Sequence, residues 1–318
     1  MVTAVEQRVV RSTAGEHRYD HLVLATGSEP VVLRGQRESA TAHVLRTRAD
    51  AARIRAALRP GARIVVVGAG WIGAEVATAA VRQGCDVTVV DSAATPLANA
   101  LPAAIGDRTV PWYRGAGVTL RWGTAVDRIT PTGLLLDDGA ELAADAVVVG
   151  VGARPATSYL ANNGVGVRTH RDGAVVVDAR LRAAASNVYA IGDIASWPSS
   201  RFGTLRTEHW DHAAQSGAHV ARAILGDARA YDPVPYVWSD QWGRCLQLVG
   251  HPVADAELVV DEGDGPDRWV AWWTSGGRLV AALAVNQPRL IRAARRSIER
   301  GDAVGAPAAA AGHPWSER

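Results

Sequence analysis

Lysine is absent from this chain of 318 residues, so all 34 of its Lys and Arg positions are arginine. Against 32 acidic residues these arginines leave a formal charge of only +2, and they are scattered along the chain rather than clustered. Nucleic-acid binding requires a concentrated basic surface. The charge balance therefore predicts no nucleic-acid partner.

Cysteine is also scarce, with Cys85 and Cys245 as the two copies. They lie far apart in the sequence and form neither a CxxC pair nor a group with the spacing of metal ligands. This pattern excludes a disulfide scaffold, predicts no metal site and is typical of a reducing cytoplasm.

Long hydrophobic runs are missing as well. No apolar stretch approaches the ~18–20 residues that a membrane helix needs. The first residues lack the basic and then apolar pattern of a signal peptide. We therefore expect a cytoplasmic protein without a membrane partner.

What is present is an ordinary globular composition, 48% hydrophobic and 21% charged. Helical spacing of apolar residues predicts helices at 47–58, 75–83, 207–225 and 288–300. Apolar runs predict strands at 19–24, 63–67, 86–90, 118–122, 133–137, 140–143, 146–152, 174–178, 187–191, 245–249, 257–260, 269–273 and 279–285. Pro233 and Pro235 mark the best candidate for a domain boundary, and the low-complexity tail at 305–312 is expected to be unstructured.

A glycine-rich motif lies where a predicted strand gives way to a helix. The β-branched run 63–67 leads into a GxGxxG motif formed by Gly68, Gly70 and Gly73, and an Ala-rich helical stretch follows. Such glycines allow a tight turn and let a pyrophosphate approach the helix N-terminus, whose amides and dipole attract an anion. We interpret this βαβ unit as a dinucleotide site. The alternative is a strand, turn and helix with a structural role only.

Asp91 indicates which nicotinamide cofactor the unit binds. It closes the second strand at about the 20-residue distance from the motif at which an acidic residue accepts hydrogen bonds from the adenosine ribose. A carboxylate there repels a 2′-phosphate, and residues 92–95 contain no arginine to hold one. The sequence therefore predicts NAD, as NADH, rather than NADPH.

Seven stretches of the chain match motifs of one known family in the same order. They are YDHLVLATG at 19–27, LRT at 45–47, VVVGAGWIGAEVA at 65–77, VVVGVGARP at 147–155, VYAIGDIA at 188–195, EHWDHAAQSG at 208–217 and PYVWSDQWGRCLQLVG at 235–250. Together they resemble the two-dinucleotide-binding flavoproteins, and within them the FAD-dependent ferredoxin and rubredoxin reductases that supply electrons to oxygenases. Their joint specificity is high, although each alone is ordinary.

The resemblance implies a set of FAD-binding residues early in the chain. Thr26 and Gly27 are similar to the family turn that passes close to FAD, and Arg46 is similar to an arginine that contacts this cofactor. For Arg46 the alternative is a solvated arginine at the start of a helix.

Further FAD contacts are implied in the second half of the chain. Gly192 and Asp193 resemble the family turn whose carboxylate accepts a hydrogen bond from the ribityl chain, and Trp210 is placed at the flavin ring. An aromatic core residue is the alternative for Trp210. Asp193 follows an apolar strand, where a carboxylate needs a partner or a ligand.

Two residues are implied at the nicotinamide. Glu75 is similar to the family glutamate near the nicotinamide ribose, and its alternative is a first-turn acid stabilised by the helix dipole. Gly152 would let the nicotinamide pack against backbone, and its alternative is a structural loop bounded by Gly and Pro.

One part of the family pattern has no counterpart in this sequence. Family members open with a βαβ unit whose own GxGxxG holds the FAD pyrophosphate, and they carry a flavin-proximal lysine. Met1 falls after that unit, so at least ~30 residues of it are missing. Either the start codon is misassigned or the chain is an N-terminally truncated fragment. We expect the chain as written to bind FAD weakly or not at all.

The resemblance implies an α/β fold with Rossmann-like FAD- and NAD(P)-binding domains and an α+β C-terminal domain. The predicted division is 1–45 for the first FAD segment, 46–157 for the NAD domain, 158–232 for the second FAD segment and 233–318 for the C-terminal reductase domain.

The implied function is electron transfer from NADH through FAD to an iron-sulfur ferredoxin or a rubredoxin that serves an oxygenase. The cofactors carry this chemistry, so we predict no catalytic side chain. The alternative function is a non-catalytic NAD-binding fragment or pseudoenzyme that has lost its FAD site.

Overall fold

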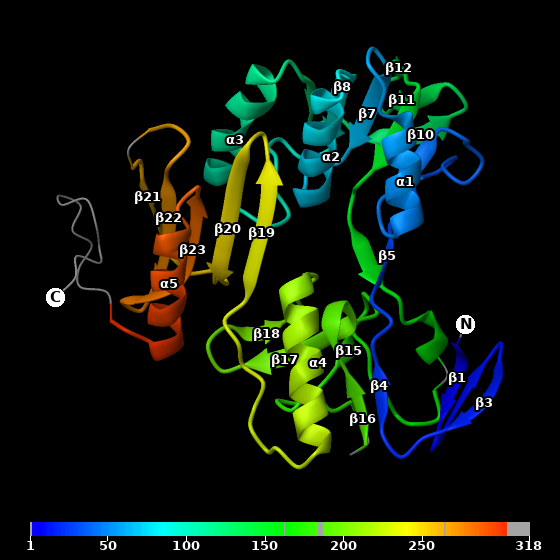
Figure 1. Ribbon diagram of the computed structural model, residues 1–318, viewed down its shortest axis with the longest axis vertical. Helices are drawn as coiled ribbons and strands as arrows, with labels where there is room; N and C mark the ends of the chain where they lie inside the picture. The colour runs from blue at the N-terminus through cyan, green and yellow to red at the C-terminus, as the bar shows by residue number, and fades with distance from the viewer. Residues whose placement is uncertain (1, 162, 184–186, 264, 304–318) are drawn as a thin grey trace. The chain divides into compact units, whose positions relative to one another are not determined.

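The computed structural model describes residues 2–161, 163–183, 187–263 and 265–303, so the tail at 305–312 lies outside the described residues. The chain forms two compact units, each assembled from separate stretches of sequence (Figure 1). Unit 1 contains Met1–Ser28, Arg154–Trp238 and Leu246–Arg318, and unit 2 contains Glu29–Ala153 and Ser239–Cys245.

Unit 2 is built around a parallel sheet of five strands in the order β6-β13-β7-β8-β9. Its strands are β6 (Ala42–Val44), β7 (Arg63–Val67), β8 (Asp86–Asp91), β9 (Thr119–Trp122) and β13 (Ala146–Val149), and its helices are α1 (Arg48–Ala57), α2 (Trp71–Arg82) and α3 (Ala103–Gly115). Parallel strands covered on both faces are continuous apolar runs, as β7 and β13 are. The predicted Rossmann-like fold is thereby confirmed.

Successive residues of β7 serve two different cores. Ile64 and Val66 pack on one face of the sheet with α2. Val65 and Val67 pack on the other face with Leu134. Leu134 belongs to a small antiparallel sheet of β10 (Val126–Thr130), β11 (Gly133–Leu136) and β12 (Glu141–Ala143).

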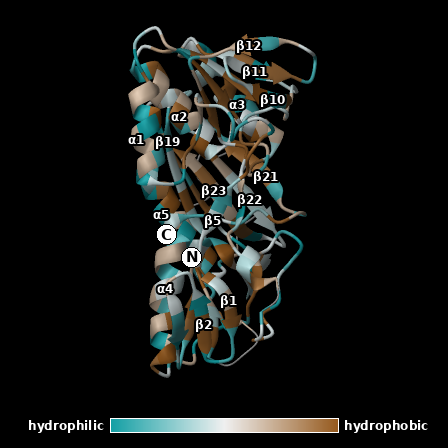
Figure 2. Cartoon of the chain, turned by 90° about the vertical axis from the view of Figure 1, so that its right-hand side faces the viewer, coloured by the Kyte–Doolittle hydropathy of each residue, from teal (hydrophilic) through white to brown (hydrophobic). Residues whose placement is uncertain are grey.

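Unit 1 contains a second parallel pair of strands, β4 (Leu22–Leu24) and β16 (Val188–Ala190). Around it lie β1 (Val2–Glu6), β2 (Val9–Ser12), β3 (Gly15–Arg18), β15 (Val175–Val176), β17 (Ala195–Ser199), β18 (Gly203–Leu205), the short 3-10 helices η1 (Ser158–Leu160) and η2 (Gly192–Ile194), and α4 (Trp210–Ile224). Helix α4 buries His212, Ser216, Val220 and Ala223, which recur at helical spacing. Figure 2 accordingly shows both hydrophobic and hydrophilic residues on this helix.

The last part of unit 1 is an antiparallel sheet in the order β19-β20-β23-β22-β21. Its elements are β19 (Tyr236–Gln241), β20 (Arg244–Gly250), β21 (Glu257–Asp261), β22 (Val270–Ser275), β23 (Arg278–Val285) and α5 (Pro288–Arg300). Ile291, Ala294 and Ile298 of α5 lie in the same core as Val249 of the sheet. The α+β character predicted for the C-terminal region is confirmed.

The units are connected by short segments of the chain. The short strands β5 (Ser28–Pro30) and β14 (Ala153–Pro155) lie where the chain passes from one unit to the other, and the tip of the β19–β20 hairpin, residues 239–245, belongs to unit 2. Residues 29–45 also belong to unit 2, since β6 pairs with β13. The division into four sequence domains places them differently and stays a prediction.

Helices α1, α2 and α3 agree to different degrees with the helices predicted from the sequence. None of the sequence patterns predicts α3, which has Gly106 and Pro111 in its interior. Helix α2 begins at Trp71, inside the glycine motif, rather than at residue 75. Helix α1 matches its prediction and begins with a capping box between Thr47 and Asp50. None of the described helices is long and apolar enough to cross a membrane.

Candidate functional site

The turn between β7 and α2 leaves an open space in front of a helix N-terminus. Gly70 is the N-cap of α2, and none of the described side chains caps the helix there. A Cβ built on Gly70 would meet no described atom within 4 Å. The first amides of a helix have no partner within the helix, so this turn can receive an anionic group such as a pyrophosphate.

The other two motif glycines are required by close backbone approaches. A Cβ on Gly73 would lie 1.9 Å from the carbonyl oxygen of Gly68, and one on Gly68 would lie 2.4 Å from that of Gly150. Gly68 also has a φ of 99°, which disfavours other residues. The predicted helix start after Gly73 is wrong because Gly73 itself lies in the first turn of α2, which begins at Trp71.

Asp91 faces this glycine turn from the end of β8. Its Oδ2 accepts a hydrogen bond from the amide of Ala69 at 2.6 Å, and its Oδ1 accepts one from the amide of Ala93 at 2.8 Å. A carboxylate has about four acceptor positions, so both oxygens can still accept from a ribose diol. The sequence predicts the carboxylate but not the two amides that orient it.

Glu75 contacts a distant part of the sequence. Its carboxylate accepts a hydrogen bond from the hydroxyl of Ser239 at 2.5 Å, and burial raises the pKa of Glu75. On the same helix the Thr78 hydroxyl accepts from the amide of Trp242 at 3.0 Å. Glu75 lies beyond the first turn of α2, so its alternative interpretation as a first-turn acid is wrong.

Gly152 follows β13 at the carboxyl edge of the same parallel sheet. Its φ is 115°, a Cβ there would meet no described atom within 4 Å, and its carbonyl accepts from the amide of Val31 at 3.0 Å. Gly68 and Gly152 thus follow the carboxyl ends of parallel strands, and Asp91 is itself the last residue of one. This is the edge at which ligands bind in open α/β sheets.

In unit 1 the carboxyl ends of β4 and β16 also meet. The Ser28 hydroxyl, shortly after β4, donates to Oδ2 of Asp193 at 2.9 Å. Thr26 lies within hydrogen-bond distance of the Tyr159 hydroxyl at 3.3 Å, and Gly27 has a φ of 68°. The structure therefore brings Thr26, Gly27 and Asp193 to one edge, as the parallel pairing of their strands requires.

The turn at Gly192 approaches helix α4 closely. Its amide donates to the Ser216 hydroxyl at 3.1 Å, and a Cβ on it would lie 3.5 Å from the Cβ of Ala213. With a φ of 64°, this residue occupies the left-handed region. The 3.5 Å contact would be an ordinary van der Waals distance, so it is the backbone conformation that favours glycine here.

Trp210 is the first residue of α4, and 71% of its surface is exposed. Its alternative interpretation as a core residue is therefore wrong. Its ring centroid lies 6.3 Å from that of Trp238, which is itself 37% exposed. Sequence reasoning did not single out Trp238 for a role, although it lies in the quoted stretch 235–250. Two exposed indoles provide a surface on which a planar ring can stack.

Arg46 lies in unit 2, whereas Thr26, Asp193 and Trp210 lie in unit 1. It precedes Thr47, the N-cap of α1, and its backbone amide donates to Asp50 at 3.2 Å. Each unit by itself therefore shows only part of the predicted FAD contacts.

The described residues contain no group of three or more side chains that could hold a metal ion. Cys85 and Cys245 form no disulfide, and burial raises the pKa of each thiol, to about 11 for Cys245. A thiol with a raised pKa is a poor nucleophile at neutral pH. The residues present thus fit nucleotides, on an open helix N-terminus and on paired strand ends, better than thiol chemistry.

Comparison with known proteins agrees with this geometry. Residues 2–217 match the family model described as pyridine nucleotide-disulphide oxidoreductase, and residues 236–314 match the model of the reductase C-terminal domain. The ferredoxin–NAD(+) reductase component of the anthranilate 1,2-dioxygenase system from Burkholderia cepacia is 37% identical over 312 residues, which are 94% of this chain and 75% of that protein. Rhodocoxin reductase from Rhodococcus erythropolis is 35% identical over 91% of this chain and 69% of its own length.

Solved structures are similar over the same span. The covalent putidaredoxin reductase–putidaredoxin complex matches with a TM-score of 0.89 and 28% identity over 96% of this chain and 76% of that chain. A ferredoxin reductase from Rhodopseudomonas palustris matches with a TM-score of 0.83 and 29% identity over 94% of this chain and 78% of that chain. The chain therefore belongs to the pyridine nucleotide-disulphide oxidoreductase family and, within it, to the ferredoxin reductases.

Proposed function

We propose that this protein is an NADH-dependent, FAD-containing oxidoreductase that delivers electrons to an iron-sulfur ferredoxin serving an oxygenase. The observation that carries the proposal is the open helix N-terminus at Gly70, with Asp91 fixed beside it. The proposal is also supported by relatives that are named as reductase components of dioxygenase systems.

In this proposal unit 2 binds NADH. The amides at the start of α2 receive the pyrophosphate, Asp91 accepts hydrogen bonds from the adenosine ribose, and Gly152 leaves room for the nicotinamide. Gly68 and Gly73 keep the turn tight enough for this approach. Glu75, oriented by Ser239, lies on the helix that follows the pyrophosphate site and is proposed near the nicotinamide ribose.

We assign the FAD contacts of unit 1 to Thr26, Gly27, Gly192–Asp193 and Trp210, and Arg46 stays a proposed contact that rests on the resemblance alone. Bound FAD would supply the conversion between hydride transfer and single-electron transfer. Among the residues of this chain, Asp193 would accept from the ribityl chain and Trp210 would cover the ring and exclude water.

The partner is proposed to be an iron-sulfur ferredoxin or a rubredoxin. One structural relative is a complex of a reductase with putidaredoxin, and another relative is named for rhodocoxin. We further propose the cytoplasm as the location, with support from the two cysteines, which are not joined in a disulfide, as a reducing compartment favours.

The test is NADH oxidation coupled to a ferredoxin. Purified protein, at FAD concentrations high enough to saturate a weak site, should reduce a [2Fe–2S] ferredoxin with NADH. The reduction would be followed by cytochrome c absorbance and should be slower with NADPH. A protein that binds NADH but neither binds FAD nor reduces ferredoxin or a dye would instead be the non-catalytic fragment, and the proposal would be rejected.

A further inference from the structure

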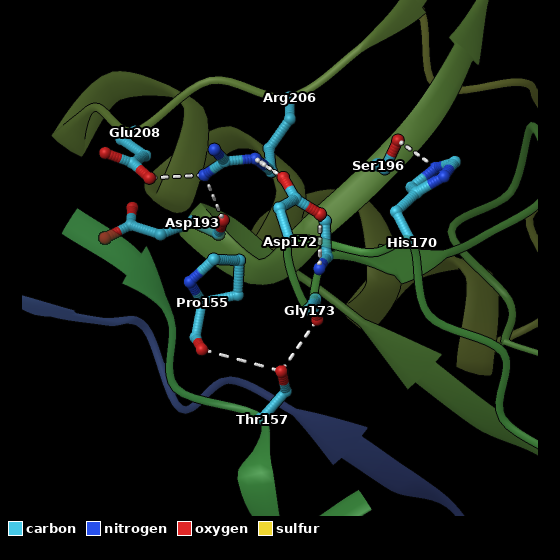
Figure 3. A network of polar contacts seen from close by, with 10 residues as sticks. Pro155, Thr157, His170, Asp172, Gly173, Asp193, Ser196, Arg206 and Glu208 are labelled. Carbon is cyan, nitrogen blue, oxygen red and sulfur yellow. Dashed lines mark hydrogen bonds and ion pairs between the residues drawn. The ribbon is translucent and has the colours of Figure 1, made fainter. Parts of the chain in front are cut away.

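Arg206, just after β18 in unit 1, contacts two other segments of the chain and a near neighbour in its own segment (Figure 3). Its Nη1 lies 3.4 Å from the backbone carbonyl oxygen of Asp193 and donates a hydrogen bond to the carboxylate of Glu208. Its Nε lies 3.5 Å from Oδ2 of Asp172. One guanidinium therefore joins the loop at Asp172, the η2 turn and the segment that leads into α4.

The contacts of Arg206 use the shape of a guanidinium. Its side chain is 26% exposed, and that of Glu208 is 33% exposed, so this pair is shielded more than a fully solvated one. Five donors in a rigid planar fork can address acceptors in several directions at once, whereas the ammonium group of lysine acts as a point charge.

The segments that Arg206 joins carry the proposed flavin contacts. Asp193 lies in η2, and Glu208 is two residues before Trp210, the first residue of α4. Asp172 is itself fixed in its turn, because its carboxylate accepts from the amide of Ala174 at 3.0 Å. Although the Asp172 side chain is 51% exposed, this hydrogen bond restrains its carboxylate at the far end of the network.

The loop at Asp172 is held by other contacts as well. The Thr157 hydroxyl donates to the carbonyl of Gly173 at 2.7 Å, and His170 lies 3.1 Å from the Ser196 hydroxyl (Figure 3). Strands β15 and β17 also pair in parallel beside it. Loss of Arg206 should therefore loosen η2 and the start of α4 while the surrounding fold remains.

We propose that Arg206 is a positioning residue of the flavin site. It fixes the backbone of Asp193 relative to the segment that begins α4, so that the Asp193 carboxylate and the Trp210 indole keep one spacing. It acts through the main chain and need not touch the cofactor. The inference rests on the proposed function, because FAD is the ligand that gives this spacing a role.

The experiment compares the full chain with Arg206→Met and Arg206→Lys. Arg229→Met is the matched control, because Arg229 forms an exposed ion pair with Asp227, only two residues away in the sequence. Hydrogen exchange would be measured at the amides of residues 192–194 and 208–212, together with FAD affinity, NADH affinity and the melting temperature of the flavin-free protein.

We expect Arg206→Met to speed exchange at both segments and to weaken FAD binding by about tenfold, as loss of hydrogen bonds to charged groups implies. Arg206→Lys should rescue only part of both effects. NADH affinity should change less than about twofold, because the residues proposed to bind NADH belong to unit 2 and Arg206 belongs to unit 1. Arg229→Met should match the parent throughout.

The outcomes separate this inference from the function on which it rests. A parent chain that binds no FAD contradicts the proposed function and, with it, the flavin role of Arg206. If the parent binds FAD and Arg206→Met leaves exchange or FAD affinity unchanged, the inference alone is overturned. A fall in NADH affinity and melting temperature as large as the fall in FAD affinity would show general destabilisation and would also overturn it.

Discussion

At the scale of single residues, Asp91 is oriented before any nucleotide arrives. The amides of Ala69 and Ala93 donate to its two carboxylate oxygens, so the side chain cannot turn away from the glycine turn without losing both bonds. Its negative charge therefore stays where it favours a ribose diol and disfavours a phosphate. In the proposed function, the choice of cofactor would thus depend on a side chain that two backbone amides hold in place.

Replacement of Asp91 by alanine should reduce this discrimination. The affinity for NADH should fall about tenfold or more, because a hydrogen bond to a charged group contributes about 1.5–3 kcal/mol, while the affinity for NADPH should fall less or rise. Fluorescence titration with both cofactors measures the change. Asp86→Ala, at the exposed opposite end of β8, is the control. Equal affinities in the parent would contradict the assignment.

His212 is a second residue whose environment has a measurable consequence. Its ring stacks on Trp197 with centroids 4.3 Å apart, and its Nδ1 lies 2.9 Å from the Tyr231 hydroxyl. Burial lowers the pKa of His212 to about 4. The unfolded chain therefore takes up a proton near pH 6.5, whereas the folded chain does not until about pH 4.

His212 should accordingly make the fold sensitive to acid. The unfolded state binds the extra proton, so the contribution of neutral His212 to the free energy of unfolding is fully present above pH 6.5. It is lost as the pH drops towards 4, by roughly 3 kcal/mol in total. Urea unfolding at several pH values should show a flatter profile for His212→Phe than for the parent. His17→Phe, on the exposed strand β3, should keep the parent profile; a parent profile in His212→Phe would refute the prediction.

Sequence reasoning finds residues with a local signature and misses those defined by distant partners. Asp91 is recognisable because it follows a strand and a glycine motif. Ser239 is not, because its role comes from a hydrogen bond to Glu75 across a long stretch of sequence. Arg206 carries no local signal either, since one arginine among 34 cationic positions is unremarkable until its three partners are seen.

At the scale of elements, helix α5 presents a stripe of arginines. Arg289, Arg292 and Arg296 recur at helical spacing and are exposed, whereas Arg295 and Arg300 pair with Glu299 and Asp302. Exposed positive charge along one face attracts an acidic partner and raises its association rate. This stripe is a candidate surface for the ferredoxin.

Charge reversal on that stripe should slow the reduction of an acidic ferredoxin. Arg292→Glu combined with Arg296→Glu should lower the rate at low salt by about tenfold, because the charges act mainly on association, and added salt should narrow the difference. NADH-dependent reduction of a small neutral dye should be unchanged. The single reversal Arg18→Glu on β3 is the control. If the double variant kept the parent's rate and salt response, the arginines of α5 would have no role in ferredoxin binding and would only be solvated.

The hairpin tip is a second element with a measurable role, since it completes the packing around α2 and α3. Trp242 packs against Tyr113 with ring centroids 4.6 Å apart, and the Arg244 guanidinium lies 4.9 Å from the ring of Trp112. Trp112 and Tyr113 are themselves buried. Residues from the C-terminal third of the sequence thus become part of unit 2.

Trp242→Ala should destabilise the protein by roughly 3 kcal/mol, within the range for large aromatic truncations, and urea unfolding would measure it. Trp210→Ala is the matched control, because its side chain lies largely in solvent. That control should change the unfolding free energy by less than about 0.5 kcal/mol. Similar decreases of the unfolding free energy in both variants would contradict the prediction that the hairpin tip stabilises unit 2.

Helix boundaries show where periodicity fails as a predictor. Helix α3 escapes prediction because Gly106 and Pro111 interrupt its pattern, and both residues disfavour a helix interior. Burial of Ile105, Trp112 and Tyr113 stabilises it nevertheless. Helices α1, α4 and α5 are predicted closely because their apolar spacing is uninterrupted.

At the scale of the whole molecule, motif order predicts the fold class and the family, because seven collinear stretches constrain each other. Which residues belong to each of the two compact units is harder to predict from the sequence. Residues 29–45 and 239–245 join unit 2 through strand pairing and side-chain packing between distant positions. Composition and spacing carry little information about such pairings.

The position of the hairpin tip in unit 2 also affects the timing of folding. A ribosome adds about 5–20 residues per second, so the tip emerges roughly 5–18 s after residue 153, when the rest of unit 2 has been made. Until then Tyr113 lacks the ring of Trp242, and Glu75 lacks Ser239. Unit 2 of a chain that is still being synthesised is therefore incomplete for seconds. A chaperone that covers α2 and α3 has that interval in which to act.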